Sequence, residues 1–414
     1  MKKINIIQFL PYYPPHKWGL ETHAQEWSNN WNRKWYWKVI NITTNIWTEY
    51  KWKDKIIKIE EDNWNTTYYL PSIEIISNFP IYKFWKKNIR NLFKELWKDK
   101  NNFIITRTRF FLTSFIWWIF VKKNKLKWIH IEHWSWYVKL SSKLKTFIAY
   151  IYDKLIWKWI FKKSNLVIPI SNACKDFVLE LWWSKIKLWP VIYRWFDFLN
   201  LVKENKLDYE IEEVRKIKEW KKEWKIILWF VWRIYKWKWV ENIIQGLQKI
   251  QLEDSQKIEK IKLVVVGDWE DLERLKNLSK KYWLENYIYF TWWKTFKEAL
   301  AIQSQFNIHI HSSLPWWWLS WTLIQWMYLA PIVISSLNEG AKEIIWKNKA
   351  KAILIWNKES YSIIDMKEAI IKWIETFKKW EDFREVNKWF IEKTFDWNKN
   401  IEKYYLELEK LNNE

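Results

Sequence analysis

The sequence predicts an α/β protein made of two doubly wound domains. Short apolar runs alternate with longer amphipathic stretches, which is the pattern of parallel sheets covered by helices. This alternation occurs twice along the 414 residues, and a charged stretch poor in strand-forming residues separates the two halves. We therefore expect one domain over residues 1–198, a linker over 199–223 and a second domain over 224–385. Residues 386–414 are expected to form a C-terminal helix that crosses back to the first domain.

Ten strands are predicted, because ten short runs rich in Ile, Val, Leu and Phe are bounded by polar or turn-forming residues. In chain order they are 4–10, 38–43, 103–106, 128–131, 166–170, 225–231, 262–266, 287–290, 308–311 and 332–335. From residue 366 to the end the pattern has only the period of helices. In open parallel sheets ligands bind beyond the carboxyl ends of the strands, so two such domains facing one another would share a binding cleft.

Tryptophan is abundant where glycine is expected. The chain has 42 Trp and only 4 Gly, whereas an average chain of this length would have roughly 29 Gly. Many of the tryptophans occupy turn positions, such as Trp134, Trp136 and Trp269, although only glycine adopts positive φ without steric penalty. We hypothesise that most of these positions are glycine in the living protein, because a UGA codon that some bacteria decode as glycine was translated as tryptophan. The alternative is a chain that is truly rich in tryptophan.

Two tryptophans are expected to be genuine. Trp27 lies inside a helical pattern, ETHAQEWSNNW, and Trp397 lies in the C-terminal helical segment. Neither is at a turn. Both are predicted to be packing residues.

The chain is strongly basic, with 70 Lys and Arg against 47 Asp and Glu and a formal charge of +23. This balance favours anionic partners, namely nucleotides, nucleic acid or an anionic membrane surface. The alternative is that AT-rich codons raise the lysine content everywhere and leave only a solvated basic surface.

Cysteine content and apolar runs predict a cytoplasmic protein. Cys174 is the single cysteine, which excludes an intramolecular disulfide and a zinc site built from several cysteines. The apolar run at 4–10 lacks a small-residue cleavage site and is expected to be a strand rather than part of a signal peptide. The most apolar internal run, 110–121, has 12 residues, too few to span a bilayer. Peripheral contact with the inner face of the plasma membrane is a further expectation.

A strand, a basic loop and an amphipathic helix follow one another over residues 225–247. The loop contains Arg233 and Lys238, five positions apart, just ahead of the helix. Two cations at a helix N-terminus can neutralise phosphate charge, including the charge that develops on a departing nucleotide. The alternative is that both side chains are solvated surface residues.

With glycine at its tryptophan positions, this loop, WFVWRIYKWKWV, resembles the GR-x(4)-KG signature of the retaining glycosyltransferases of family 4, the glycosyl transferases group 1. The resemblance extends over nearly the whole chain. It implies the GT-B fold, in which two Rossmann-like domains face a central cleft, followed by C-terminal helices. It also implies that Arg233 and Lys238 bind the diphosphate of a nucleotide-sugar donor and contribute to catalysis.

Three further motifs extend the resemblance. PPHKWGLETHAQEW resembles the family's glycine pair after the first strand, so Trp18 and Gly19 would meet the donor phosphate or the acceptor. HIEHWSWYV resembles the loop that places a histidine near the sugar, which makes His133 the candidate catalytic histidine, with a purely structural histidine as the alternative. VVVGDWEDLERL resembles an element at the edge of the cleft and assigns Gly267 to the donor site.

The last motif departs from the family. Members commonly have two glutamates eight positions apart, and SSLPWWWLSWTLIQWMY aligns Trp317 with the first and Gln325 with the second. The Gln325 amide can still hydrogen-bond a ribose hydroxyl. If the tryptophans are decoded as glycine, backbone N–H groups around Trp317 and Trp318 could hold the sugar or phosphate. Downstream, NEGAKEII resembles GG-x-x-EII and places Glu343 near the same pocket.

The function implied is transfer of a hexose from a nucleotide diphosphate sugar to a glycan, lipid-linked or small-molecule acceptor, with retention of configuration, in cell-envelope polysaccharide biosynthesis. No cofactor and no divalent metal are expected, since the sugar nucleotide is a co-substrate. Two alternatives keep the fold: a nucleotide-sugar epimerase, and a catalytically silent relative that binds sugar nucleotides or glycans. A third alternative is a nucleic-acid binder with lysine and tryptophan interleaved. Tryptophans scattered over many turns argue against it, and no nucleic-acid partner is expected.

Overall fold

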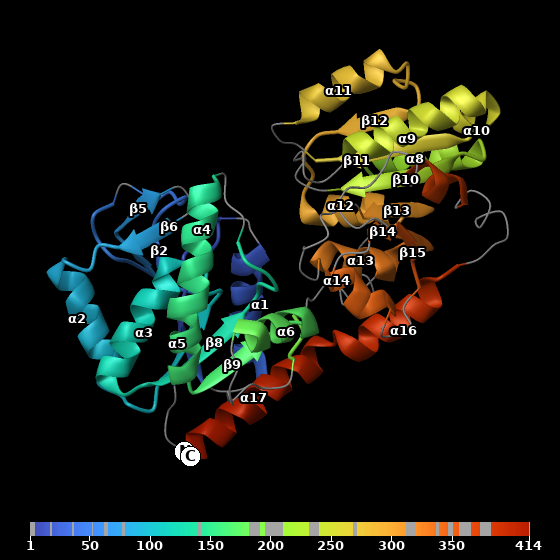
Figure 1. Cartoon of the computed structure of the whole chain (residues 1–414). Helices are drawn as coiled ribbons and strands as arrows, with labels where there is room; N and C mark the ends of the chain where they lie inside the picture. The colour runs from blue at the N-terminus through green and yellow to red at the C-terminus, as the bar shows by residue number, and fades with distance from the viewer. Residues whose placement is uncertain are drawn as a thin grey trace. The chain divides into compact units, whose positions relative to one another are not determined.

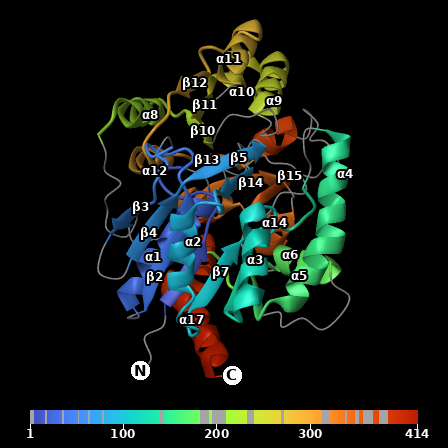
Figure 2. The same ribbon diagram turned by 90° about the vertical axis from the view of Figure 1, so that its left-hand side faces the viewer.

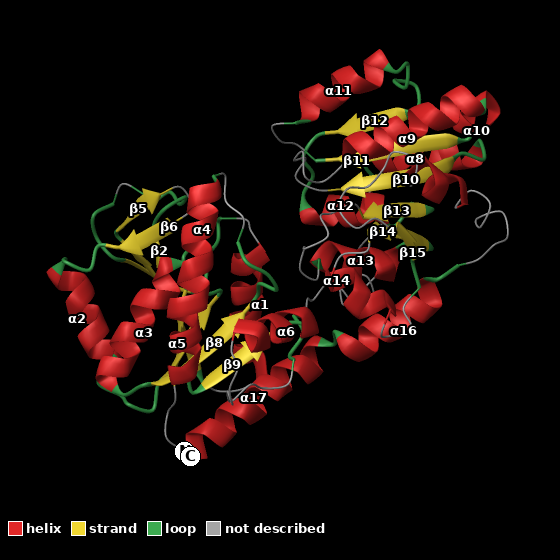
Figure 3. Ribbon diagram, viewed as in Figure 1, coloured by secondary structure: helices red, strands yellow, loops and turns green. Residues whose placement is uncertain are grey.

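The chain divides into two units, one formed by residues 1–197 with 395–414 and the other by residues 198–394 (Figure 1). Each is an α/β unit with helices on both sides of a mainly parallel sheet, which confirms the predicted fold class (Figure 3). The computed structural model describes residues 5–16, 19–34, 37–51, 53–61, 65–76, 79–138, 142–181, 191–194, 210–231, 240–267, 271–311, 320–336, 339–346, 351–355, 366–372 and 382–413.

The sheet of the first unit has seven strands in the order β3-β4-β2-β1-β7-β8-β9. All neighbours are parallel except β3 and β4. The strands are β1 (Asn5–Phe9), β2 (Lys38–Thr44), β3 (Ile57–Glu60), β4 (Asn65–Leu70), β7 (Phe103–Arg107), β8 (Lys127–Glu132) and β9 (Leu166–Pro169). A separate antiparallel pair is formed by β5 (Ser72–Ile76) and β6 (Phe79–Tyr82).

Helices cover both faces of this sheet because successive side chains of each buried strand point to opposite faces. Ile7 and Phe9 of β1 pack on one face with residues of α2, α3, α5 and α6, and Ile6 packs on the other with α1 and α17. The helical segments are α1 (Gly19–Lys34), α2 (Lys87–Leu96), α3 (Leu112–Asn124), α4 (Lys143–Ile151), the π-helix η1 (Tyr152–Trp157), α5 (Lys158–Lys163), α6 (Asn172–Leu181) and α17 (Trp397–Asn413). The α4, η1 and α5 segments follow one another as a single long rod (Figure 2).

The sheet of the second unit has six parallel strands in the order β12-β11-β10-β13-β14-β15. They are β10 (Ile226–Val231), β11 (Ile261–Val266), β12 (Ile288–Thr291), β13 (Ile308–His311), β14 (Ile332–Ser336) and β15 (Ile353–Ile355). The helical segments are α8 (Glu212–Lys222), α9 (Val240–Glu253), α10 (Ser255–Glu259), α11 (Leu272–Lys281), α12 (Phe296–Gln303), α13 (Trp321–Leu329), α14 (Glu339–Ala341), the π-helix η3 (Lys342–Trp346) and α16 (Arg384–Thr394). None of the described helices in either unit has both the length and the apolar character needed to cross a membrane.

Both parallel sheets reverse their strand order beside their first strand. In the first unit the reversal falls between β1 and β7, and in the second between β10 and β13. In doubly wound sheets this switch point opens a crevice at the carboxyl ends of the strands, where ligands bind. The topology therefore marks one candidate binding edge in each unit.

All ten predicted strands are present. Within the predicted linker, residues 212–222 form α8, whose buried Val214 and Ile217 pack against Trp229 of the second sheet. The stretch 386–414 is divided between two helices, since α16 belongs to the second unit and α17 to the first. Trp27 packs as predicted: it is fully buried and stacks on Trp31, with ring centroids 4.8 Å apart.

Candidate functional site

At the binding edge of the first unit, side chains from three elements meet. His23 lies in the second turn of α1, Arg107 is the last residue of β7, and His133 follows the last residue of β8. Because β7 and β8 are parallel neighbours, their carboxyl ends lie side by side. The polar side chains that follow them are therefore brought to one place beside the β1/β7 switch point.

His133 is held by hydrogen bonds through both ring nitrogens. Its Nε2 lies 2.9 Å from Nδ1 of His23, and its Nδ1 lies 3.2 Å from the hydroxyl of Thr108. The ring is half-buried. A sugar hydroxyl that approaches this ring must therefore compete with Thr108 or His23 for a nitrogen.

Arg107 decides which nitrogen of His23 carries its proton. Its Nη1, which can only donate, lies 3.3 Å from Nδ1 of His23, so that nitrogen must be an acceptor and the proton of His23 lies on Nε2. The Nδ1 of His133 has two neighbours at 3.2 Å, the Thr108 hydroxyl and the backbone carbonyl of Ile131, which can only accept. The contacts therefore assign the tautomer of His23, whereas the ring of His133 has partners for either tautomer.

Both histidines are neutral at physiological pH. Burial, reinforced by the positive charge of Arg107, lowers the pKa of His23 and of His133 well below 6.5. Arg107 is fully buried, and burial lowers its pKa to about 10. Its Nε and Nη2 donate to the carbonyl oxygen of the Gln8 side chain. No carboxylate of the described residues pairs with it, so this edge of the sheet has an uncompensated positive charge that favours an anionic or electron-rich ligand.

A buried ion cluster beneath this edge fixes the start of the His133 loop. Glu132 accepts hydrogen bonds from the backbone N–H groups of His133 and Trp134, and it lies 3.3 Å from Nη1 of Arg109. Arg109 is in turn paired with Asp153 of η1 at 3.1 Å. Although burial opposes it, the charge of Arg109 and the hydrogen bond from His130 bring the pKa of Glu132 down to about 2. Glu132 is therefore ionised and positions the loop that follows β8.

Gly19 begins α1 and is exposed. A Cβ at this position would lie 3.4 Å from Nη1 of Arg194, whose guanidinium pairs with Glu26 at 3.7 Å. The first turn of α1 thus lies beside a second cation of the first unit. The other member of the predicted pair, Trp18, lies outside the described residues.

In the second unit the described part of the predicted donor site begins at Gly267. This residue directly follows β11 and has φ 139°, a conformation that residues with a side chain rarely adopt. Its neighbour Val266 is paired with Val231, the last residue of β10. Gly267 therefore lies next to the point where the chain enters the predicted phosphate-binding loop. Arg233 and Lys238, in that loop, lie outside the described residues.

The remaining predicted residues of the second unit are dispersed among its helices. Gln325 of α13 is buried, and its amide nitrogen donates to Gln303 of α12 at 3.1 Å. Glu343 lies in η3 and is only 4% exposed. Trp317 and Trp318 lie outside the described residues.

Two histidines of β13 lie against α13. His309 and His311 are buried, and no described residue hydrogen-bonds to either ring nitrogen of His309. Both rings pack against Trp326 of α13 in the interior of the second unit.

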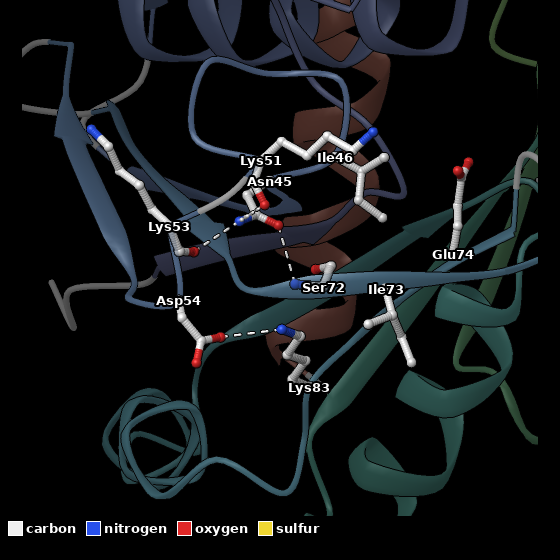
Figure 4. Close-up of a pocket in the computed structure, with 9 residues that line it drawn as sticks. All are labelled: Asn45, Ile46, Lys51, Lys53, Asp54, Ser72, Ile73, Glu74 and Lys83. Carbon is white, nitrogen blue, oxygen red and sulfur yellow. Dashed lines mark hydrogen bonds and ion pairs between the residues drawn. The ribbon is translucent and has the colours of Figure 1, made fainter.

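A pocket of about 390 Å³ lies elsewhere in the first unit, between the loop after β2 and the β5–β6 pair (Figure 4). The Asn45 side chain spans it, accepting from the backbone N–H of Ser72 and donating to the carbonyl of Lys53. Lys83 closes one side through an ion pair with Asp54 at 3.2 Å. None of the predicted site residues lines it; its lining is Asn45, Ile46, Lys51, Lys53, Asp54, Ser72, Ile73, Glu74 and Lys83.

Sequence reasoning did not select His23, Arg107, Arg109 or Glu132 as residues that build this edge. The signal was present in the sequence, because TRTR and EH stand directly after two apolar runs. In a parallel sheet, polar residues at that position converge at one edge.

Comparison with known proteins gives both close and distant relatives. Residues 210–388 match the family described as glycosyl transferases group 1. The chain is 38% identical over 417 residues to an uncharacterized glycosyltransferase of Methanocaldococcus jannaschii, with 100% of both proteins covered. Its fold is similar to that of sucrose-phosphate synthase from Thermosynechococcus elongatus, with a TM-score of 0.72 at 17% identity and 99% of each chain covered. It is also similar to Anabaena HepE in complex with UDP-glucose, with a TM-score of 0.69 at 12% identity, covering 98% of this chain and 99% of that one.

Proposed function

The chain belongs to the glycosyl transferases of group 1 and has the GT-B fold, and from this premise we propose that it transfers a hexose from a nucleotide diphosphate sugar to a glycan or lipid-linked acceptor, with retention of configuration. The observation that carries the proposal is the full-length match at 38% identity to a glycosyltransferase. Polar residues at the β1/β7 switch point and a glycine turn after β11 are consistent with it. Synthesis of a cell-envelope polysaccharide is the process in which we place the reaction.

A nucleotide-sugar donor is supported by the relatives and by charge. HepE has been solved with UDP and with UDP-glucose. In this chain we assign Arg233 and Lys238 to the donor diphosphate, because cations beside a helix N-terminus stabilise the charge that develops on the leaving group. Gly267, Gln325 and Glu343 are assigned to the same donor site, together with the backbone at Trp317 and Trp318. Trp18 and Gly19 are assigned to the phosphate or acceptor side.

His133 is proposed to contact the transferred sugar as a neutral hydrogen-bonding group. Its lowered pKa keeps the ring neutral, so one of its nitrogens donates and the other accepts, and it does not act as a cation. Arg233 and Lys238, rather than His133, are proposed to neutralise the negative charge of the leaving diphosphate. On this assignment no divalent metal is needed.

The test is release of nucleoside diphosphate from a panel of sugar nucleotides, with and without an acceptor extract. We expect acceptor-dependent release with one donor. Arg233→Ala should reduce kcat/KM about 100-fold or more, in the range found when a single transition-state donor is removed. Arg90→Ala, a change at an exposed residue of α2, is the matched control and should retain full activity.

A second candidate function is a catalytically silent protein that binds sugar nucleotides. It is favoured by the absence of both motif glutamates and by the amide of Gln325, which is bound to Gln303. Calorimetric binding of a sugar nucleotide without turnover for any donor would select this candidate. Interconversion of the free sugar nucleotide would instead indicate an epimerase.

We further infer that most tryptophans at turns are glycine in the native protein. Trp224 and Trp283, at φ 59° and 56°, each follow a helix at the position where glycine is preferred. After α8 the N–H groups of Trp224 and Lys225 bond to the carbonyls of Lys221 and Trp220, which is the hydrogen-bond pattern of a Schellman motif. Mass spectrometry of the native protein tests this, and tryptophan retained at positions 224 and 283 would refute it.

A further inference from the structure

An apolar stripe runs along the exposed side of the α4–η1 rod. The α4 stripe consists of five exposed apolar side chains: four in α4 recur at positions i, i+3, i+4 and i+7 and share one face of that helix, and Leu155 follows in η1. Their exposed fractions are 69% for Leu144, 59% for Phe147, 58% for Ile148, 39% for Ile151 and 68% for Leu155. No described residue of α4 is buried. Single exposed apolar residues are common on protein surfaces, but several adjacent ones, as in this stripe, indicate an interaction surface.

The rod is anchored at its base and free toward its N-terminal end. In η1, Trp157 is fully buried in the core of the first unit, and Asp153 is ion-paired with Arg109. Tyr150 contacts Tyr137 with ring centroids 4.8 Å apart. These contacts fix the direction of the helix and leave the α4 stripe facing solvent.

The charge along the rod is almost entirely positive. Residues 142–163 include six lysines and one acidic residue, Asp153. The carboxylate of Asp153 is only 4% exposed and is neutralised by Arg109, so it contributes no negative charge at the surface. Five of the lysines are exposed: Lys143, Lys145, Lys158, Lys162 and Lys163. An apolar stripe bordered by lysines is the pattern of a helix that lies in the interface of an anionic bilayer.

We propose that the α4 stripe docks on a bilayer containing anionic lipids, with the apolar side chains in the acyl boundary and the lysines at the headgroups. A second copy of the chain fits this surface less well, because pairing two such helices would bring two sets of lysines together without acidic partners. This inference deepens the proposed function, since it names a lipid-linked acceptor presented at a membrane. It rests on that function only for the acceptor, because docking itself requires no turnover.

The test is sedimentation of the full chain with phosphatidylcholine vesicles, with and without phosphatidylglycerol. We expect binding only with phosphatidylglycerol, weakening as salt is raised because exposed charges are screened. Two triple variants should each reduce the partition coefficient at least tenfold. The apolar variant combines Leu144→Gln, Phe147→Gln and Leu155→Gln, and the lysine variant combines Lys145→Gln, Lys158→Gln and Lys162→Gln. All six side chains are exposed, so the variants should retain the fold.

Matched controls lie in the second unit. Leu252→Gln removes an apolar side chain that is 76% exposed on α9. Lys280→Gln, Lys281→Gln and Lys297→Gln remove three exposed positive charges outside the rod. Both controls should bind vesicles like the unaltered chain. Equal binding by the apolar variant and the unaltered chain would overturn the proposal, as would a dimer in solution that the apolar variant converts to monomer.

A parallel assay separates this proposal from the proposed function. Release of nucleoside diphosphate with a soluble acceptor should be the same in all of these variants, because none of the altered residues is assigned to the donor site. Vesicle binding without any release would leave the docking surface supported and refute transfer. Release without vesicle binding would support transfer and refute the docking surface.

Discussion

At the scale of single residues, the site in the first unit depends on histidines that are kept neutral. His23 and His133 are linked to each other, and Arg107 donates to His23. A protonated His23 would face Arg107 and would lose its acceptor nitrogen, so the fold favours the neutral ring. This gives the candidate site a defined response to pH and to substitution.

We expect stability to fall as the pH is lowered from about 7 to about 5. The pKa values of His23, His133 and His309 are lowered well below 6.5, first of all by burial. Below pH 6.5 the unfolded chain therefore binds protons that the folded chain does not. Each such histidine reduces the free energy of unfolding by about 1.4 kcal/mol per pH unit in this window. Urea unfolding at several pH values measures this, and a flat profile would contradict it.

His23→Asn should change the pH response as well as the activity. An asparagine can accept from Arg107 through its carbonyl but does not titrate. We expect the pH dependence of unfolding to become shallower, and KM to change less than kcat, because His23 positions His133 rather than binding substrate. If both the pH slope and kcat stay as in the unaltered chain, the hydrogen bonds of His23 have no role in the reaction.

Replacing tryptophan by glycine should change the stability of the chain in opposite directions at turns and in the core. Trp224→Gly and Trp283→Gly should each stabilise the chain by about 1 kcal/mol, because a residue with a Cβ is disfavoured at φ near +60°. Both indoles are more than 80% exposed and bury little. Trp27→Gly, in the core, should cost more than about 3 kcal/mol. Thermal unfolding of the three variants provides the comparison, and destabilisation by all three would argue against glycine at turns.

At the scale of elements, the end of β8 is the part of the first sheet most dependent on charge. Glu132 bonds the loop that bears His133 and faces Arg109. Glu132→Gln should lower the free energy of unfolding by about 3 kcal/mol, because it leaves the buried Arg109 with fewer negative partners. Glu180→Gln is the control, since this exposed glutamate lies 3.8 Å from Lys154 and should matter by less than about 1 kcal/mol. Equal effects in the two variants would show that the buried cluster does not hold the strand end.

The elements that sequence reasoning predicted are those with continuous apolar runs. Strands buried on both faces, such as β10 and β11, are distinctive without any knowledge of their neighbours. β4 was missed because its sequence, NTTYYL, puts buried Thr66 and Thr67 where apolar residues are expected. α8 lies within the predicted linker because charged residues dominate this stretch, although Val214 and Ile217 form a buried side.

The candidate site was predictable only in part, for a related reason. A motif identifies His133, but its partner His23 and the Arg107 that donates to His23 are 110 and 26 positions away from it along the chain, and only the strand order brings them together. A hydrogen bond over that separation has no periodic signal in one sequence. The assignments of Arg233 and Lys238 remain predictions from their motif.

At the scale of the whole molecule, the charge of +23 sets the expectation for catalysis. If side-chain cations neutralise the leaving diphosphate, the enzyme should keep its full rate in excess EDTA, because no divalent ion has to carry that charge. The measurement is release of nucleoside diphosphate before and after dialysis against EDTA. A rate restored only by added Mg²⁺ or Mn²⁺ would assign the role to a metal.

The position of α17 has a consequence for biosynthesis. Its Ile401, Tyr404 and Leu408 complete the core around Trp27 in the first unit, yet they are translated after the entire second unit. Nascent domains generally fold in the order in which they emerge from the ribosome. The first unit therefore cannot bury this hydrophobic face until residues 401–408 have been translated, so a chain truncated before them would expose apolar surface and would be prone to aggregation.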